Sequence, residues 1–342
     1  MKSLAKLSAA AIVTAALAPA TLADGRNPGS VLIYPVTHSN NPYMTVVSVT
    51  NINTQPANPN SFGGSTNVMF EYVNTIPNPQ DSQLPLDCFV IDRVEHLTPA
   101  DTLSVMTDCH NAADLEGYLV ITAQDPEKFK TAWKFDYLIG SELVVLGNGG
   151  TYSINAIPFE AGKNLADYGE TDKDNDGRLD FNDTEYERMP DKLYIDSFVG
   201  AGRSNLVLLN LSGGTQYQAV AAFDIWNDNE FPLSATKLFR CWFEEHLADV
   251  SLVFSQDFLA LNTPNDPQEL DLNCDNVGDI ETGWAVIEGL VATSTNNTII
   301  DPVFLGSITA GPSKSIDGGH LLWESLERSK QDAEFLNFGV GN

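Results

Sequence analysis

The stretch Phe70-Glu71-Tyr72-Val73-Asn74 decides the fold, because a closely similar stretch, Phe223-Asp224-Ile225-Trp226-Asn227, occurs in the second half of the chain. A cysteine follows each stretch at the same distance along the chain, Cys88 in the first half and Cys241 in the second. A repeat this long has the size of a whole domain and not of a solenoid turn. The chain is therefore predicted to contain two tandem copies of one domain.

Further matches follow the first in the same order along both halves. They are Glu95-His96-Leu97 with Glu245-His246-Leu247, Cys109 with Cys274, Asp114–Tyr118 with Asp279–Trp284, Ile139-Gly140-Ser141 with Leu305-Gly306-Ser307, and Phe159-Glu160 with Trp323-Glu324. Chance rarely preserves such an order, so we expect an internal duplication.

The composition of the repeat is that of an all-β protein. Short apolar or alternating runs are separated by clusters of Asn, Pro, Gly and Ser, which is typical of β-strands joined by turns. Runs this short and regular predict two β-sandwich domains, over residues 24–162 and 191–325. The strands expected are 31–34, 45–49, 67–73, 118–122, 143–146 and 152–157 in the first domain, and 192–195, 205–211, 217–225, 250–254, 284–291 and 304–308 in the second.

Two pairs of these strands resemble the paired strands of immunoglobulin-like or fibronectin-like modules of bacterial surface proteins. One pair is 45–51 with 67–72, and the other is 205–210 with 218–224. The resemblance covers one hairpin in each copy and implies an immunoglobulin-like β-sandwich. The Asn residues in these segments are expected equally of turns, where Asn tolerates left-handed geometry.

The N-terminus carries the pattern of a secretory signal peptide. Lys2 and Lys6 precede an apolar run over 7–17, and the small residues before Asp24 suit cleavage after Ala23. Residues 1–23 are therefore predicted to direct export to the periplasm or beyond. No later run reaches the roughly 20 apolar residues that a membrane-spanning helix needs, so no membrane span is expected. The residues after the second domain, 326–342, are predicted to form a polar C-terminal tail.

Four cysteines suit an oxidising compartment, where an even number of thiols favours disulfides. A disulfide inherited from one ancestral domain must close within each copy. The duplication therefore predicts that Cys88 pairs with Cys109 and that Cys241 pairs with Cys274. The alternatives are four free thiols or a metal site, although a zinc site needs closer Cys spacing or a cluster of Cys and His.

The charge of the chain excludes one class of partner. It holds 46 acidic against 18 basic residues, a formal net charge of −28. Such a surface repels nucleic acid and anionic lipid and favours cations and basic partners. We therefore expect no nucleic-acid binding.

The most specific local pattern lies in the polar, acidic segment 163–190, which is predicted to link the two domains. The sequence Asp172-Lys173-Asp174-Asn175-Asp176-Gly177-Arg178-Leu179-Asp180-Phe181-Asn182-Asp183 resembles the calcium loop of an EF-hand. It places side-chain oxygens at loop positions 1, 3, 5, 9 and 12 and a glycine at position 6. The ligands implied are Asp172, Asp174, Asp176, Asp180 and Asp183, with the backbone carbonyl of Arg178.

This loop departs from the EF-hand pattern at two positions. Position 12 is Asp183 instead of Glu, and the next residue, Thr184, is not apolar. Calcium loops of dockerins and of thrombospondin-type repeats also end on Asp, although dockerins carry two loops and this chain has one. We favour a Ca²⁺ site, and the alternative is a solvated acidic linker. A similar acidic stretch over 271–279 lacks the glycine at position 6 and is interpreted as a turn.

Other candidate groups are interpreted as structural. His96 and His246 lie in matching Glu-His-Leu contexts and are expected to form a structural pair with their neighbouring Glu. The five tryptophans could form a sugar-binding face, but Trp226, Trp284 and Trp323 align with apolar residues of the other copy, so core positions are expected for them. The sequence contains no nucleophile elbow, zinc-helix, phosphate-loop or dinucleotide motif.

The sequence thus predicts a secreted, non-enzymatic, calcium-binding protein of two β-sandwich domains, with a role in adhesion, matrix formation or assembly in the cell envelope or outside it. Its partners would be calcium and an envelope protein or a polysaccharide. One alternative is a carbohydrate-binding module, in which exposed tryptophans hold the ligand. A second is a hydrolase with its site at the domain interface, marked by buried carboxylates of raised pKa in a cleft.

Overall fold

The computed structural model describes residues 27–323, apart from 41, 59–60, 81–83, 129, 203, 214, 263–270, 272–273, 276–277 and 312–315. The expected signal peptide and C-terminal tail lie outside the described residues. The fold is almost entirely β, with 54% strand and 6% helix, so the all-β class is confirmed. No helix within the described residues is long and apolar enough to cross a membrane.

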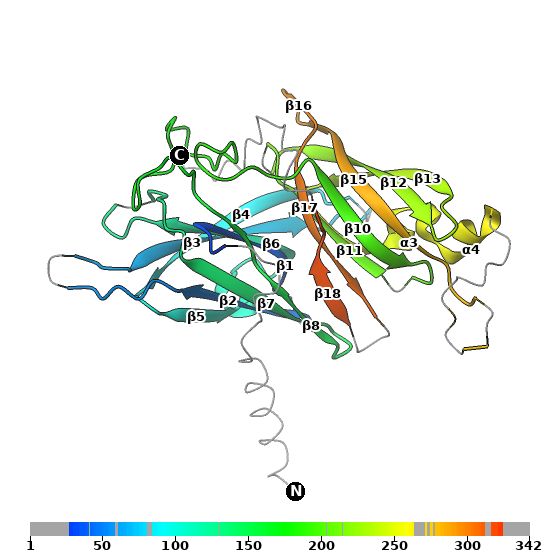
Figure 1. Cartoon of the computed structure of the whole chain (residues 1–342), viewed down its shortest axis with the longest axis horizontal. Helices are drawn as coiled ribbons and strands as arrows, with labels where there is room; N and C mark the ends of the chain where they lie inside the picture. The colour runs from blue at the N-terminus through cyan, green and yellow to red at the C-terminus, as the bar shows by residue number, and fades with distance from the viewer. Residues whose placement is uncertain are drawn as a thin grey trace, which may run out of the picture.

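The N-terminal half of the chain forms two antiparallel sheets, on the left in Figure 1. The first has the strand order β4-β3-β6-β1-β9, and the second has the order β5-β2-β7-β8. Their strands are β1 (Val31–His38), β2 (Met44–Asn51), β3 (Thr66–Ile76), β4 (Asp87–Leu97), β5 (Thr102–Met106), β6 (Glu116–Gln124), β7 (Leu138–Val145), β8 (Thr151–Asn155) and β9 (Ile157–Phe159). A single helical turn, α2 (Thr107–His110), follows β5.

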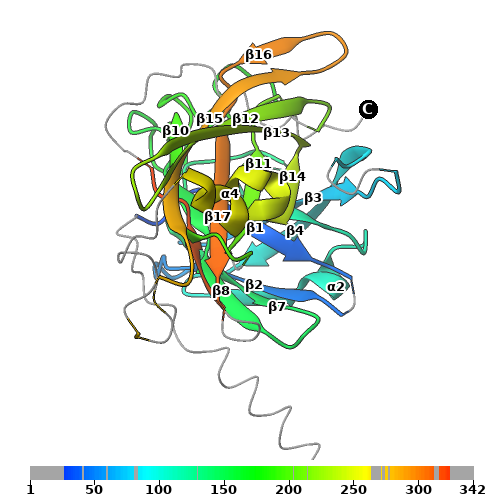
Figure 2. The same cartoon turned by 90° about the vertical axis from the view of Figure 1, so that its right-hand side faces the viewer.

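The C-terminal half forms two further antiparallel sheets, on the right in Figure 1. Their orders are β10-β15-β12-β13, with β16 paired to β15, and β14-β11-β17-β18. The strands are β10 (Lys192–Val199), β11 (Ser204–Asn210), β12 (Gln218–Asn227), β13 (Pro232–Arg240), β14 (Trp242–His246), β15 (Thr282–Thr293), β16 (Thr298–Ile300), β17 (Phe304–Ala310) and β18 (Asp317–His320). The short helices α3 (Leu247–Val250), η1 (Leu252–Phe254), α4 (Gln256–Leu259) and η2 (Ala260–Asn262) follow β14, and α4 lies towards the viewer in Figure 2.

The two halves use their strands in corresponding order. Counted from the start of each half and leaving out β16, which only extends β15, β4-β3-β6-β1 corresponds to β13-β12-β15-β10, and β5-β2-β7-β8 corresponds to β14-β11-β17-β18. The register also agrees, because Gly117 pairs with Asn74 and Gly283 pairs with Asn227. The first strand of each half carries a register irregularity just before it reaches that glycine, between Tyr34 and Thr37 in β1 and between Ile195 and Phe198 in β10.

Among the described residues, three hydrophobic cores hold the molecule together. One lies between the two N-terminal sheets and one between the two C-terminal sheets. The third joins the halves, because it contains Val31 and Ile33 of β1 together with Val207 and Leu209 of β11. Strand β1 is consequently buried along its whole length, since its alternate side chains enter the first and the third core.

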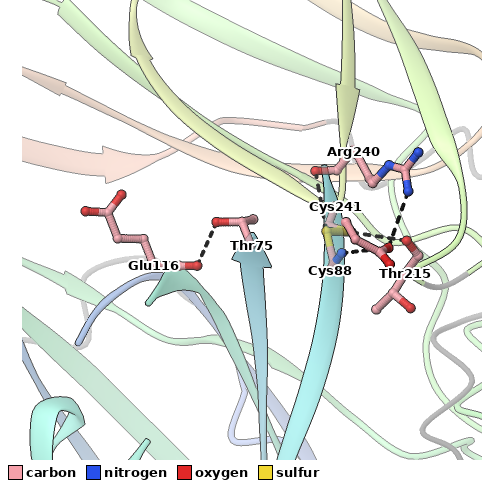
Figure 3. The surroundings of a disulfide bond; sticks show 7 residues. Thr75, Cys88, Glu116, Thr215, Arg240 and Cys241 are labelled. Atoms are coloured by element: carbon pink, nitrogen blue, oxygen red, sulfur yellow. Dashed lines mark hydrogen bonds and ion pairs between the residues drawn. A yellow bond between two sulfur atoms is a disulfide. The ribbon is translucent and has the colours of Figure 1, made fainter. Parts of the chain in front are cut away.

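The disulfide prediction is wrong. The structure joins Cys88 to Cys241, one from each half (Figure 3). It leaves Cys109 and Cys274 free and exposed. Equal spacing along the sequence does not place the two cysteines at equivalent positions of the fold, because Cys88 lies at the start of β4 while Cys241 follows the end of β13. The two cysteines therefore occupy opposite ends of corresponding hairpins and meet where the halves touch. Beside them, Arg240 forms an ion pair with Asp87 at 3.3 Å.

The alignment of the two Glu-His-Leu segments is also wrong. His96 lies in β4 and pairs with Asn67 of β3, whereas His246 ends β14 and pairs with Asn205 of β11. By strand order these are not corresponding elements. Short polar segments recur by chance in strands whose exposed faces are rich in charge, so this match carried no structural information.

The aromatic positions are divided between core and surface. Trp133 and Trp242 are buried, and Trp323, for which a core position is expected, packs against the core while partly buried. Trp284, however, is 41% exposed, and its ring stacks on that of Trp226 with 4.2 Å between ring centres. The core expectation is therefore wrong for this pair, which occupies facing positions on the outer side of β12 and β15.

Candidate metal site

The predicted calcium ligands lie between β9 and β10, where Asp174, Asp176 and Asp183 are exposed while the base of the segment is packed. Phe181 and Tyr186 are fully buried and stack with 5.4 Å between ring centres, and Phe159 of β9 contacts Phe181 edge to face at 4.9 Å. The hydroxyl groups of Tyr186 and Thr171 are 2.8 Å apart. These aromatic anchors belong to the core that joins the two halves, so they fix the base of the acidic loop.

Three of the predicted ligands converge. Asp172, Asp174 and Asp176 each offer a carboxylate oxygen, and these oxygens lie within 4.8 Å of one another. Backbone N–H groups orient the carboxylates, since Gly177 donates to Asp172 at 3.1 Å and Arg178 donates to Asp176 at 2.9 Å. Gly177 has a φ of 76°, the left-handed conformation that favours glycine at the sixth position of such a loop.

Glu185 is a candidate ligand that the sequence pattern missed. Only 2% of its surface is exposed to solvent. Its Oε1 accepts a hydrogen bond from the backbone N–H of Lys173, whereas its Oε2 is buried without a hydrogen-bond partner. Burial above all, together with the neighbouring charges of Asp180 and Asp172, raises the pKa of Glu185 to about 7, although the hydrogen bond from the Lys173 N–H opposes this shift.

Asp183, the predicted twelfth-position ligand, is engaged elsewhere. Its side chain is 58% exposed and forms an ion pair with Arg188 at 2.8 Å. The backbone N–H of Arg188 also donates to its Oδ1 at 3.3 Å. Arg178 turns its guanidinium towards Asp176 at 3.5 Å, and Asp180 accepts a hydrogen bond from Asn182 at 3.4 Å.

The loop has the chemistry of a site for a hard cation. Asp172 Oδ1, like Glu185 Oε2, is buried without a hydrogen-bond partner. Burial raises the pKa of Asp172 first, and the charges of Asp176 and Asp174 add to the effect. Buried carboxylate oxygens that lack donors are costly unless a cation compensates them. Oxygen-only donor sets of this kind suit Ca²⁺.

Glu185 lies two residues beyond the twelve-residue pattern, which explains why loop spacing alone did not find it. The sequence feature that could have indicated Glu185 is the adjacent Tyr186, because a residue next to a buried aromatic side chain lies close to the core. His38 has no acidic neighbour along the sequence, but the structure places it between Glu116 and Glu244, at 3.4 Å and 3.0 Å. That contact joins residues from both halves and cannot be read from sequence spacing.

His96, predicted as part of a structural pair, lies on β4 with its Nδ1 2.8 Å from the side-chain oxygen of Asn67. The glutamate neighbouring it, Glu95, contacts His110 instead at 3.3 Å. Neither histidine belongs to the acidic loop.

Comparisons of the chain with protein-family models, with curated proteins and with solved structures find no match.

Proposed function

We propose that the segment between β9 and β10 binds one Ca²⁺ ion. The ligands would be the carboxylates of Asp172, Asp174, Asp176 and Asp180, the carbonyl of Arg178 and, in place of Asp183, the carboxylate of Glu185. The observation that carries this proposal is the buried Oε2 of Glu185, which lacks a hydrogen-bond partner beside a cluster of acids. An ion would compensate both unpartnered oxygens and the repulsion among the carboxylates.

The ion would act structurally. The loop is continuous with Phe181 and Tyr186, which enter the core shared by both halves. Ordering the loop would therefore stabilise that core, and binding to the folded state alone adds RT ln(1 + [Ca²⁺]/Kd) to the free energy of unfolding.

Titration calorimetry tests the site. The wild type is expected to bind one equivalent of Ca²⁺ at concentrations up to the millimolar range of extracellular modules. The double variant Asp172→Ala, Asp176→Ala removes two loop ligands and should lose the heat of binding. Asp257→Ala in α4, an exposed acid outside the loop, is the matched control and should bind as the wild type does. If the wild type shows no heat of binding, or if the double variant binds Ca²⁺ equally well, the loop is only a solvated acidic linker.

We infer in addition that the two halves are copies of one immunoglobulin-like β-sandwich domain, over residues 24–162 and 191–325, joined by the linker 163–190. The support is the corresponding strand order and the matching glycine register. In each half, side chains of two sheets share one core. A crystal structure in which Phe70 superposes on Phe223 and Gly117 on Gly283 is the expected result, and different strand connectivity would refute the duplication.

Our proposal for the whole chain is a secreted, non-enzymatic calcium-binding protein with a role in adhesion, matrix formation or assembly, in the cell envelope or outside it. The signal-like segment 1–23, the Cys88–Cys241 disulfide and the net charge of −28 support it. Cell fractionation should recover a chain that begins at Asp24. Recovery of the uncleaved chain in the cytoplasm would contradict the proposed location.

Carbohydrate binding is a second candidate function, favoured by Trp226 and Trp284. Their stacked rings lie on an outer sheet face, and Trp284 is 41% exposed. Aromatic faces of this kind provide contact area for a ligand with apolar faces. Retention on an insoluble polysaccharide column, lost in Trp284→Ala but kept in Leu290→Ala on the same strand, would support this function. If the wild type passes through the column without retardation, carbohydrate binding by this pair is excluded.

A further inference from the structure

A small pocket of about 120 Å³ lies between the acidic loop and the first sheet. One wall is the face of β3, β4 and β6 that points away from the core between the N-terminal sheets, and it includes Met69, Asp92 and Thr122. The acidic loop forms the opposite wall, with Asp172 and Gly177. Pockets for small organic ligands usually measure roughly 300–1,000 Å³. A pocket of this size has room for an ion with a few water molecules and not for a sugar or a peptide.

Apolar packing holds the loop against this face of the sheet. Leu179, Phe181 and Tyr186 of the loop share the third core with Val73 of β3 and Val120 of β6. The pocket therefore borders a packed contact, so its walls are in place before any ligand arrives.

Glu71 points from β3 into the pocket. Its neighbours along the strand, Phe70 and Tyr72, enter the core between the two N-terminal sheets. Because successive side chains of a strand point to opposite faces of the sheet, Glu71 points to the face that the loop covers, and it lines the pocket there. Only 4% of its surface is exposed.

The carboxylate of Glu71 reaches the pocket without a partner. Within the part of the chain that the structure describes, its side chain forms neither a hydrogen bond nor an ion pair. Its oxygens are not sealed in the interior, in contrast to Oδ1 of Asp172, so the small exposed fraction of Glu71 includes its carboxylate. A carboxylate in such surroundings is costly unless a cation compensates its charge.

The neighbouring side chains do not supply that compensation. Lys130 and Arg178 also line the pocket, but they are engaged with Asp92 at 3.7 Å and with Asp176 at 3.5 Å. Asp92 lies directly opposite Glu71 on the neighbouring strand, where like charges repel each other. Burial raises the pKa of Glu71 well above its usual range, and Asp92 adds to this effect more than Lys130 offsets it.

We propose that this pocket binds a divalent cation of the Mg²⁺ type, which keeps part of its water shell. Among the described residues, three carboxylates converge closely only in the acidic loop. Mg²⁺ suits the pocket because it retains several water molecules and takes only one or two carboxylates from the protein. Glu71 binds the ion directly, and water molecules on the ion connect it to Asp92 and Asp172. The ion fastens the acidic loop to the first sheet.

Titration of Mg²⁺ into protein kept in millimolar Ca²⁺, followed by calorimetry, tests the proposal, because Ca²⁺ keeps the loop site filled. The wild type is expected to bind one equivalent of Mg²⁺. Glu71→Gln has nearly the same shape without the charge and should weaken Mg²⁺ binding by tenfold or more, as for the loss of a charged ligand. Asp92→Asn, at an exposed position of β4, should weaken it several-fold.

Two comparisons separate this site from general effects and from the calcium site. Glu142→Gln removes another buried carboxylate, outside the pocket, and should bind Mg²⁺ as the wild type does. Asp174→Ala with Asp176→Ala removes two loop carboxylates that do not line the pocket. This double variant should lose the heat of calcium binding and still bind one equivalent of Mg²⁺ in the absence of Ca²⁺, whereas Glu71→Gln should keep its calcium binding.

Three results would overturn the proposal. The wild type could bind no Mg²⁺ beside Ca²⁺, or the loop double variant could bind no Mg²⁺ at all, which would place the ion in the loop. Glu71→Gln could also bind Mg²⁺ as tightly as Glu142→Gln, which would show that a proton and not a cation neutralises Glu71. A wild type that binds Mg²⁺ in the pocket but no Ca²⁺ would refute the calcium site alone.

Discussion

At the scale of a single residue, Gly117 and Gly283 determine how closely neighbouring strands approach in each half. A Cβ atom on Gly117 would collide with the carbonyl oxygen of Val73, and one on Gly283 would collide with that of Trp226. Both glycines sit at the start of the central strand of their sheet, β6 and β15. A close approach of neighbouring backbones therefore selects glycine here.

Replacing either glycine by alanine should lower the free energy of unfolding by roughly 1–3 kcal/mol, the typical cost of overpacking. Gly319→Ala is the control, because no atom lies within 4 Å of the added Cβ, and it should change stability little. Urea denaturation of the three variants provides the measurement. Comparable stability of all three would show that the sheets relax around the methyl groups and that the register does not depend on glycine.

At the scale of elements, hydrophobic pattern predicted most of the strands that alternate or are wholly apolar, although it missed β5, and it missed strands with charged faces. Strand β4 escaped prediction because Asp92, Arg93, Glu95 and His96 interrupt its apolar residues. The segment 250–254 was predicted as a strand, but it forms the end of α3 and the turn η1. Val250 and Phe254 are buried while Leu252 is 74% exposed. That is the spacing of one helical turn, because in a strand all three would share a face.

The acidic loop was predictable as an element, since its Asp spacing and Gly177 are visible in the sequence. Its closing carboxylate was not predictable, because the packing of Tyr186, and not loop spacing, decides that Glu185 turns inward. The pairing of Asp183 with Arg188 likewise depends on the fold of the segment.

Calcium affinity should depend on pH through Glu185. The pKa of about 7 means that Glu185 carries a proton below pH 7 in the folded, calcium-free protein, and this proton must leave before the carboxylate binds a cation. Affinity should therefore fall by up to about tenfold for each pH unit below 7 and level off above it. Calorimetric titrations at pH 5.5, 6.5, 7.5 and 8.5 measure this profile. A flat profile across pH 7 would contradict a role for Glu185.

At the scale of the whole molecule, the halves are bound to each other by a shared core and by a disulfide. The sequence predicts two similar halves but not this contact, because matching segments describe each half by itself and carry no information about their relative placement. Trp242 of β14 shows the consequence, since its indole N–H donates to the carbonyl of Pro35 in β1 at 2.8 Å. Matching of the two halves could not predict a contact between different positions of each half.

Removing the disulfide by Cys88→Ala with Cys241→Ala should lower the free energy of unfolding by roughly 5 kcal/mol, the loop-entropy estimate for a bridge across 153 residues. Because the third core remains, denaturation should still follow a single transition, with both halves unfolding together. Cys109→Ala with Cys274→Ala is the matched control and should leave stability almost unchanged, since both thiols are exposed. Two separate transitions in the disulfide variant would show that the bridge, and not the core, couples the halves.

Whether Glu185 closes a calcium site is tested by the calcium affinity of Glu185→Gln beside that of Asp183→Asn, measured by titration calorimetry at pH 8. Glu185→Gln is expected to weaken calcium binding by tenfold or more, as for the loss of a charged ligand. Asp183→Asn is expected to stay within about twofold of the wild type, because Asp183 pairs with Arg188 and surface ion pairs contribute little. The reverse order, with Asp183→Asn losing calcium and Glu185→Gln retaining it, would show that Asp183 and not Glu185 closes the site.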